Sequence, residues 1–216
     1  MSLTTTRSSI LVIEGHPDGQ SFVGGLARAY AEGARAAGSV VETVRLAELR
    51  FDPVLHHGFH GEQPLEPDLV RVHEAILRAG HVVFAFPTWW AAPPALVKGF
   101  VDRTFLPGVA FRFEPGASLP TGLFAGRSAR LITTMDSPSW WYRLKHGRAV
   151  HRSFISATLD FVGFAPVASR TVYKVRELDE AAREAALRRA SRDGARDAAA
   201  LHARGAQRRV WQWKQV

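Results

Sequence analysis

The sequence contains no cysteine. Disulfide bonds, thiolate metal sites and cysteine nucleophiles are therefore excluded, and the composition is compatible with a reducing cytoplasm. Long apolar runs are also missing, because nowhere do about 18 consecutive apolar residues occur, as a membrane-spanning helix would need. The apolar run 10–13 is too short to form the centre of a signal peptide. We therefore expect a soluble, cytoplasmic protein that is not inserted into a membrane.

Several familiar catalytic and nucleotide-binding motifs are absent as well. The chain has no G-x-G-x-x-G sequence, no Walker loop and no G-x-S-x-G nucleophile elbow. Three loop histidines, His56, His57 and His60, lack carboxylate or cysteine partners at the spacing of metal ligands. We interpret them as solvated side chains and predict no metal site. These absences disfavour a dinucleotide-type Rossmann site and a hydrolase, and leave open a smaller ligand that carries a phosphate.

Charge of one sign is in excess but is not concentrated. The 216 residues carry a formal net charge of +8, yet the arginines are spread along the chain and interrupted by acids, as over 183–197. No dense basic block alternates with exposed aromatics, so we expect no nucleic-acid partner. The length and the ordinary composition predict a single domain over 1–216. The ends, 1–9 and about 205–216, are expected to be flexible or to cover a partner subunit.

Short apolar runs alternate with segments of helical spacing along the chain. Strands are predicted at residues 10–13, 40–46, 82–86, 129–134 and 166–175. Helices are predicted at residues 22–37, 69–77, 96–105, 154–162 and 179–203. One further short surface strand is predicted at 109–113. Five strands that alternate with five helices predict an α/β fold with a doubly wound, five-stranded parallel sheet and helices on both faces.

The loop 15–21 follows the first predicted strand and opens a helix, for which Ser21 is the expected N-cap. Its backbone amides and the Ser21 hydroxyl would face the positive end of the helix, where anions bind readily. A plain capped turn is the alternative interpretation. In an open parallel sheet, ligands bind at the carboxyl ends of the strands, so this loop is a candidate anion site.

Two further loops at strand ends are rich in aromatic residues. Trp89 and Trp90 follow Pro87 after one buried strand, and the loop 133–142 follows another. Wide, rigid side chains suit a concave site for a flat ligand, although ordinary core packing is the alternative. The three loops together offer backbone donors, hydroxyls and aromatic rings but few acid–base pairs. Such a site is typical of a protein that binds a cofactor and lets the cofactor carry the chemistry.

These loops carry a resemblance to a known family. The chain resembles the flavodoxin-like NAD(P)H:quinone oxidoreductase family, also called the DT-diaphorase type. The matching segments are GHPDGQSF at 15–22, FDP at 51–53, FPTWWAAPPALVKGFVDRTFLPGVAF at 86–111 and the pair Thr133-Thr134. They occur in the order and at the spacing of the family over roughly residues 10 to 170, and the long central motif is the most specific.

The resemblance implies a homodimer of flavodoxin-like subunits with a flavin at the dimer interface. The implied flavin is FMN, with FAD as the alternative. Hydride would pass from NADPH or NADH to the flavin and then, in the same pocket, to a quinone or similar acceptor, which is a ping-pong scheme. A second possibility is an ancillary regulatory flavoprotein subunit of a membrane ion-efflux system, since some relatives have that role.

The resemblance also implies which residues bind the flavin. Its phosphate and ribityl chain would lie beside His16, Ser21 and Phe22. The isoalloxazine ring would lie along the second loop, with backbone amides as donors, and along the start of the third. The residues implied there are Pro87, Thr88, Trp89, Trp90, Thr133, Thr134, Met135 and Asp136. In the family a glycine pair follows the two threonines, whereas this chain has Met135-Asp136.

Substrate and catalytic residues are implied less directly. The acceptor pocket would be bounded by Trp90, Trp141 and Tyr142, while the order of residues leaves open which of Trp89 and Trp90 faces the flavin. His146 is the candidate catalytic residue, as a donor that stabilises the N1/O2 edge of the reduced ring. Reduction places negative charge on that edge, and preorganised donors stabilise such charge.

Overall fold

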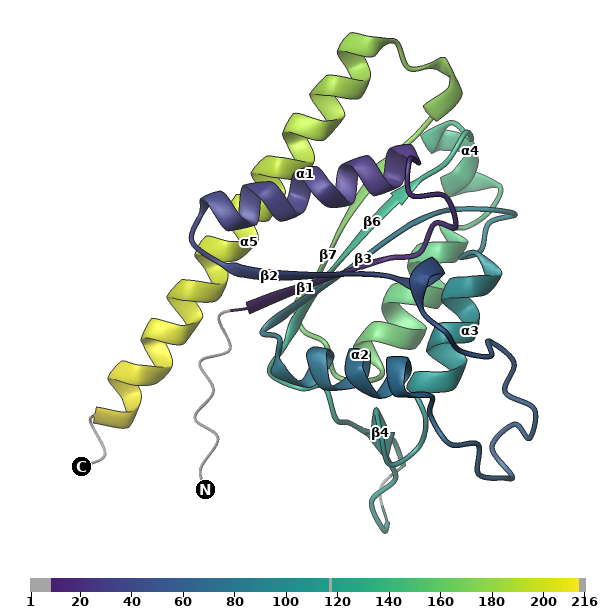
Figure 1. The fold of residues 1–216 in the computed structure, drawn as a ribbon, viewed down its shortest axis with the longest axis vertical. Helices are drawn as coiled ribbons and strands as arrows, with labels where there is room; N and C mark the ends of the chain where they lie inside the picture. Colours follow the sequence, from purple (N-terminus) through teal and green to yellow (C-terminus); the bar gives the residue numbers. More distant parts are fainter. Residues whose placement is uncertain (1–8, 117, 214–216) are drawn as a thin grey trace.

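Five parallel strands form the centre of the molecule. The computed structural model describes residues 9–116 and 118–213, with side chains as far as Arg204. The strands lie in the order β2-β1-β3-β6-β7 (Figure 1). Their bounds are β1 Ser9–Glu14, β2 Val40–Arg45, β3 His81–Pro87, β6 Ser128–Thr134 and β7 Val167–Val172. This topology confirms the predicted five-stranded parallel sheet.

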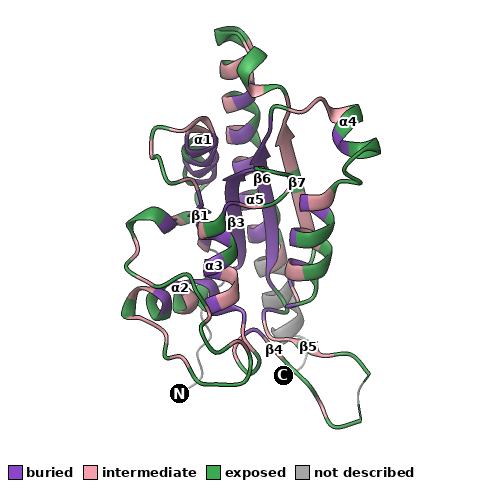
Figure 2. Ribbon diagram, turned by 90° about the vertical axis from the view of Figure 1, so that its right-hand side faces the viewer, coloured by how far each residue is buried: buried purple, intermediate pink, exposed green. Residues whose placement is uncertain are grey.

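The helices cover both faces of the sheet. One face packs against α1 (Phe22–Ala36) and α5 (Glu180–Trp213), and the other packs against α2 (Pro67–Arg78), α3 (Ala95–Thr104) and the π-helix η2 (His151–Asp160) (Figure 1). Side chains alternate along a strand, so β3 contributes to both cores. Every residue of β3 and β6 is buried (Figure 2). Burial on both faces is why 82–86 in β3 appears in the sequence as a continuous apolar run, whereas β6 includes Arg130.

Helices α1 and α5 approach each other at two glycines. A Cβ on Gly33 would lie 2.0 Å from the Ser191 carbonyl oxygen, and one on Gly194 would lie 2.0 Å from the Tyr30 carbonyl oxygen. No other residue type fits at these contacts without movement of the backbone. The close packing fixes α1, and therefore also fixes the loop 15–21 that enters it.

Three elements differ from their predictions. The predicted strand 109–113 contributes only β4 (Phe111–Arg112), which pairs with β5 (Thr121–Gly122). Helix α4 (Ser139–Leu144) lies inside a segment predicted as loop, because six residues are too few to show a helical period. The predicted helix 154–162 starts earlier and is wound as a π-helix. Gly147 and Arg148, both with positive φ, separate it from α4.

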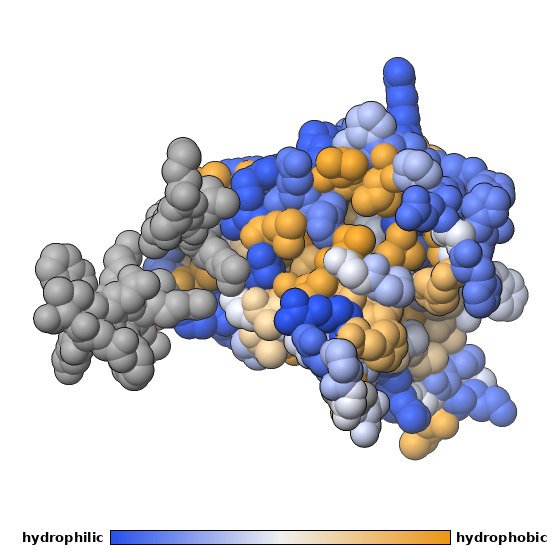
Figure 3. Space-filling model, turned by 90° about the horizontal axis from the view of Figure 1, so that it is seen from below, coloured by the Kyte–Doolittle hydropathy of each residue, from blue (hydrophilic) through white to orange (hydrophobic). Residues whose placement is uncertain are grey.

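The last helix is longer than predicted. The sequence predicts its end near 203, whereas α5 continues to Trp213, so residues 205–213 are helical. The alanine- and arginine-rich sequence contains no proline that would stop it. Residues 1–8 and 214–216 of the expected tails lie outside the described part of the chain. Seen from below, the surface mixes apolar and hydrophilic side chains, so apolar exposure is not confined to one site (Figure 3).

Candidate functional site

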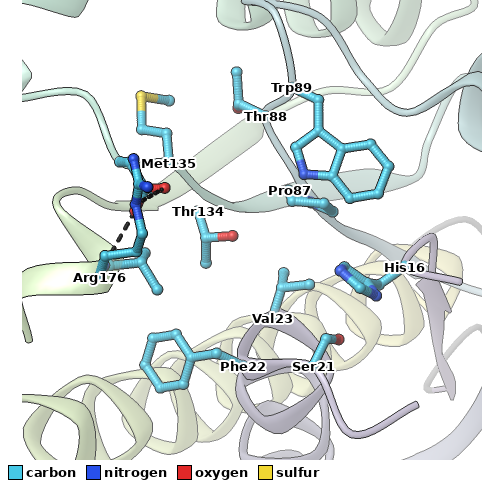
Figure 4. A pocket seen from close by; sticks show the side chains of 12 residues that line it. His16, Ser21, Phe22, Val23, Pro87, Thr88, Trp89, Thr134, Met135 and Arg176 are labelled. Carbon is cyan, nitrogen blue, oxygen red and sulfur yellow. Dashed lines mark hydrogen bonds and ion pairs between the residues drawn. The ribbon is translucent and has the colours of Figure 1, made fainter. Parts of the chain in front are cut away.

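A pocket of about 210 Å³ lies at the carboxyl ends of the strands (Figure 4). Its walls come from the loop after β1, the loop after β3, the loop after β6 and the 3-10 turn η3 (Val175–Glu177) after β7. The lining residues are His16, Ser21, Phe22, Val23, Pro87, Thr88, Trp89, Thr134, Met135, Asp136, Val175 and Arg176. The structure therefore brings together the three loops that the sequence singled out, and adds a fourth segment.

The loop 15–21 has the geometry of an anion site. The Ser21 hydroxyl caps α1 by accepting a hydrogen bond from the Gly24 amide at 3.2 Å. Phe22 and Val23 belong to the first turn of the helix, where amides have no intrahelical acceptor, and both line the pocket. The Asp18 amide donates to His16 Nδ1 at 2.9 Å, which fixes the loop. Free donors and the helix dipole together suit a phosphate.

A buried carboxyl group lies at the base of this loop. Glu14 is the last residue of β1, and its side chain is buried beside the first turn of α1. Burial raises the pKa of Glu14, while the Arg45 guanidinium, with Nε 3.4 Å from Glu14 Oε2, partly opposes this. The raised pKa favours the neutral carboxyl group, and the Arg45 guanidinium compensates the charge of the ionised one, so Glu14 repels an incoming anion less than an unpaired carboxylate would.

The aromatic loop after β3 forms a tight, strained turn. Trp89 and Ala92 exchange two backbone hydrogen bonds, of 3.0 and 2.9 Å. Between them, Trp90 and Ala91 have φ angles of +52° and +58°. Residues with a side chain enter this left-handed region at a cost of roughly 1–2 kcal/mol each. The turn directs the Trp89 indole along the pocket, edge-on to His16, and leaves Trp90 fully exposed.

This geometry separates the two tryptophans, which the sequence could not do. Trp89 lines the pocket, whereas Trp90 does not. It also changes the expected backbone donors. The Thr88 amide donates to the Thr134 carbonyl at 2.7 Å and the Trp89 amide to Ala92, so neither is free for a ligand. Pro87 has no amide. Of the four residues expected to supply such donors, only Trp90 keeps one without a described acceptor.

The loop after β6 contributes an ion pair that the sequence did not reveal. Thr133 is buried and its hydroxyl bonds that of Thr88 at 2.8 Å, so Thr133 supports the pocket from behind. Asp136 accepts a hydrogen bond from the Arg176 amide at 3.0 Å, and its second oxygen pairs with Arg176 Nε at 2.9 Å. Asp136 is thus neutralised at the rim. Arg176 follows a strand end, so the rule that ligands bind there would have pointed to it.

The residues expected around the acceptor lie apart from this pocket. Tyr142 is buried and its hydroxyl bonds His151 Nδ1 at 3.0 Å, while His151 Nε2 bonds the Thr171 hydroxyl at 3.0 Å. Trp141 and His146 are exposed and make an edge-on ring contact with each other. Neither lines the pocket of the single chain, so the catalytic role of His146 stays a prediction. His151 was missed because its partners are brought to it only by the fold.

Comparisons with known proteins agree with this architecture. A family model for the flavodoxin-like fold matches residues 8–193, and the chain therefore belongs to the flavodoxin-like family. No helix in the described residues is long and apolar enough to cross a membrane.

Individual relatives confirm the resemblance to quinone oxidoreductases. An uncharacterized NAD(P)H oxidoreductase from Haemophilus influenzae is 26% identical over 182 residues, covering 82% of this chain and 89% of that protein. A ribosyldihydronicotinamide dehydrogenase (quinone) from Pongo abelii is 26% identical over 183 residues, covering 74% and 78%. The solved NAD(P)H:quinone oxidoreductase from Methanothermobacter marburgensis superposes with a TM-score of 0.73 at 26% identity, covering 87% of this chain and 97% of that one.

Proposed function

We propose that the protein is a flavin-dependent NAD(P)H oxidoreductase that passes a hydride from a nicotinamide to a quinone-like acceptor. The observation that carries this proposal is the meeting of an anion cradle, an aromatic wall and a neutralised carboxylate in one pocket. The names of the relatives agree with the activity. The names of the relatives indicate the class of reaction, and the pocket residues of this chain indicate how a flavin and its substrates would be held.

The residues of the pocket fit a flavin mononucleotide. The amides of Phe22 and Val23 and the Ser21 hydroxyl suit a single phosphate. Trp89 on one side and Met135 on the other bound a space suited to a flat ring. We propose FMN in preference to FAD because the described pocket contains one such phosphate cradle.

The flavin, when bound, supplies the hydride chemistry, and the chain's residues position it and shape its surroundings. Arg176 compensates the charge of Asp136, which would otherwise oppose negative charge on a reduced ring. The hydrogen bond between Thr88 and the buried Thr133 holds the loops after β3 and β6 at a fixed separation. Because reductant and acceptor would use the same pocket, we propose that they bind in turn, in a ping-pong scheme.

We also propose that the working form is a homodimer. Apolar side chains near the pocket are exposed in the single chain, with relative exposures of 101% for Trp90, 59% for Trp140 and 82% for Leu144. A second subunit would cover them and would complete the acceptor site beside Trp141 and His146. Analytical ultracentrifugation tests this directly, and a mass of one chain at micromolar concentration would contradict it.

The test of the function starts from the colour of the purified protein. We expect a yellow protein that releases FMN, identified by mass, when it is denatured. Anaerobic NADPH or NADH should bleach it, and a simple quinone should restore the colour. Initial rates at several quinone concentrations should give parallel double-reciprocal lines. A colourless protein that takes up neither FMN nor FAD would rule the proposal out.

One result would favour the other possibility from the sequence. Flavin binding without measurable turnover of quinones would point to an ancillary regulatory subunit. No feature within residues 9–116 and 118–213 favours that role over the enzyme, so we retain the oxidoreductase as the proposed function.

A further inference from the structure

One charged side chain at the mouth of the pocket lies outside the phosphate cradle formed by Ser21, Phe22 and Val23. Arg176 lies beside Met135, on the side of the pocket opposite His16 and Trp89 (Figure 4). Its side chain is 85% exposed, so the guanidinium faces the solvent from which substrates enter. Among the lining residues it is the only arginine or lysine. The pocket therefore has a single permanent cation, at its rim.

The backbone beneath Arg176 is fixed from two sides. Asp136 accepts a bond from the Arg176 amide, and the Val175 amide donates to the Met135 carbonyl at 3.3 Å. From the other side, Arg183 donates through Nη2 to the Val175 carbonyl at 2.8 Å. The segment is held between the loop after β6 and helix α5. The backbone that carries the side chain is therefore ordered before a ligand binds, which lowers the entropy lost on binding.

The contact with Asp136 also orients the guanidinium. Asp136 Oδ2 pairs with Nε at 2.9 Å, whereas no described residue accepts a hydrogen bond from Nη1 or Nη2. Two parallel donors are left on the outer edge of the group. A planar guanidinium with two free donors matches the paired oxygens of a phosphate or a carboxylate.

The chemistry of the reductant suggests which anion meets this group. The nicotinamide ring has to enter the pocket, so the pyrophosphate, one ribose away, remains near the mouth. A neutral quinone carries no such charge. The relatives include enzymes named for NAD(P)H and enzymes named for the ribosyl dihydronicotinamide, which has no phosphate. The charge at the rim is therefore a feature that can separate the two classes of reductant.

We propose that Arg176, oriented by Asp136, binds the pyrophosphate of the nicotinamide nucleotide and so makes this chain selective for phosphate-bearing reductants over the riboside. The inference rests on the proposed function, because it concerns the reductant of that same pocket. It assigns specificity to a residue outside the three loops that the sequence singled out.

The test compares four reductants on the flavin-loaded full chain, with one neutral quinone as acceptor: NADH, NADPH, reduced nicotinamide mononucleotide and reduced nicotinamide riboside. We expect Arg176→Gln to lower kcat/KM about tenfold for NADH and NADPH, the size of one charge-assisted contact. The value for the riboside should change less than about twofold, since it lacks the anion. Arg176→Lys should retain part of the effect. Arg188→Gln, which removes an exposed arginine on α5, is the matched control for net charge.

A binding measurement separates affinity from turnover. The dissociation constant of NADP⁺, measured by calorimetry, should rise in Arg176→Gln by a similar factor and should not rise in Arg188→Gln. Asp136→Asn should weaken binding less than Arg176→Gln, because it loosens the guanidinium without removing it.

Each outcome that would contradict the inference points to a different error in it. An equal loss for all four reductants would overturn the inference, as would loss of the flavin absorbance in Arg176→Gln, which would make Arg176 a flavin contact. A loss confined to NADPH would overturn the pyrophosphate assignment in favour of the 2′-phosphate. If the unaltered chain binds no flavin or oxidises none of the four reductants, the proposed function itself fails, and that is seen before any variant is made.

Discussion

On the face of the sheet covered by α2, α3 and η2, aromatic rings of the strand β3 pack edge to face against η2, whereas the strand β6 presents a buried charge to the helices on the other face. On the first face, Phe154 lies with its ring centroid 5.2 Å from that of Phe84 and 4.8 Å from that of Phe86. On the second, Arg130 of β6 donates to Asp197 of α5 at 2.6 and 2.9 Å. Tyr30 and His81 also contact Asp197, at 2.7 and 3.3 Å.

The two faces therefore specify their helices in different ways. Apolar contact is not directional, so aromatic packing tolerates small shifts of η2. Helix α3 is held in addition by the buried Arg103, which pairs with Glu66 and donates to the Asp52 and Pro64 carbonyls of the preceding loop. A buried ion pair is satisfied in only one arrangement and leaves an uncompensated charge if one partner is lost. The charged face holds α5 in one register, and through the contacts at Gly33 and Gly194 it also holds α1. Helix α1 supplies the anion cradle, so the directional face is the one that positions the site.

The largest expected effect on stability comes from removing a carboxylate of the buried network under α1 and α5. Asp197→Ala should lower the free energy of unfolding by up to roughly 3–5 kcal/mol, because the buried Arg130 would lose its two hydrogen bonds to Asp197 and keep only the longer pair with Asp193, at 3.5 Å. Urea denaturation followed by circular dichroism measures this. Arg188→Ala, which removes an exposed pair with Glu184, is the control and should change stability by less than about 1 kcal/mol. A loss for Asp197→Ala no larger than that control would show that the buried network is not a strong constraint.

The next largest effect is a dependence of stability on pH, and it arises from His81 on the face under α1 and α5. Burial lowers the pKa of His81, although the nearby Asp197 carboxylate, which can accept a hydrogen bond from the ring, partly opposes this. His81 thus stays neutral in the folded chain when the unfolded chain begins to bind a proton, near pH 6.5. Its contribution to stability is present above pH 6.5 and is lost as the pH falls, by at most about 1.4 kcal/mol per pH unit.

The variant His81→Asn should make the fall in stability with decreasing pH shallower. Burial also lowers the pKa values of His73 and His151, so a residual slope is expected from them. Urea midpoints at pH 7.5, 6.5 and 5.5 provide the measurement. An unchanged slope in the variant would mean that His81 is protonated equally in the folded and unfolded chains.

A smaller effect is expected on the aromatic face. Phe154→Leu replaces one apolar side chain by another of similar volume, and such exchanges usually cost less than about 1.5 kcal/mol. We expect a loss of about 1 kcal/mol, mainly from the two edge-on ring contacts. The same denaturation assay applies. A loss as large as that of Asp197→Ala would mean that the aromatic face is as specific as the charged one, and the comparison between the faces would fail.

The same difference explains what the sequence could predict. The apolar strand β3 is visible in the sequence as a continuous run, so the sheet and its order of elements followed from such short runs and from the helical spacing between them. The charged face is not visible, because Arg130 and Asp197 are 67 residues apart and only the fold joins them. The site divides in the same way. The loops at strand ends were predicted from topology, whereas the pairing of Asp136 with Arg176, across 40 residues, was not.

Short local features also limit what can be predicted from the sequence. Helix α4 has only six residues, and the burial of Tyr142 depends on His151 and Thr171, which approach it through η2 and β7. No spacing in the sequence separates this buried pair from the exposed His146. For the same reason, the order of Trp89 and Trp90 carried no information on which faces the pocket, because the left-handed turn that separates them is a property of the backbone.

The smallest expected effect concerns that turn, formed by residues 89–92 after β3. Ala91 has a φ of +58°, and glycine adopts this region without the clash that a Cβ makes. Ala91→Gly should stabilise the chain by about 0.5 kcal/mol, since relief of strain exceeds the added freedom of the unfolded chain. Ala92→Gly, one residue along and without a positive φ, should instead destabilise it slightly. If the strain serves to hold Trp89 along the pocket, Ala91→Gly should also weaken FMN binding in a fluorescence titration. A more stable variant with unchanged FMN affinity would show that the strained turn is tolerated without serving the site.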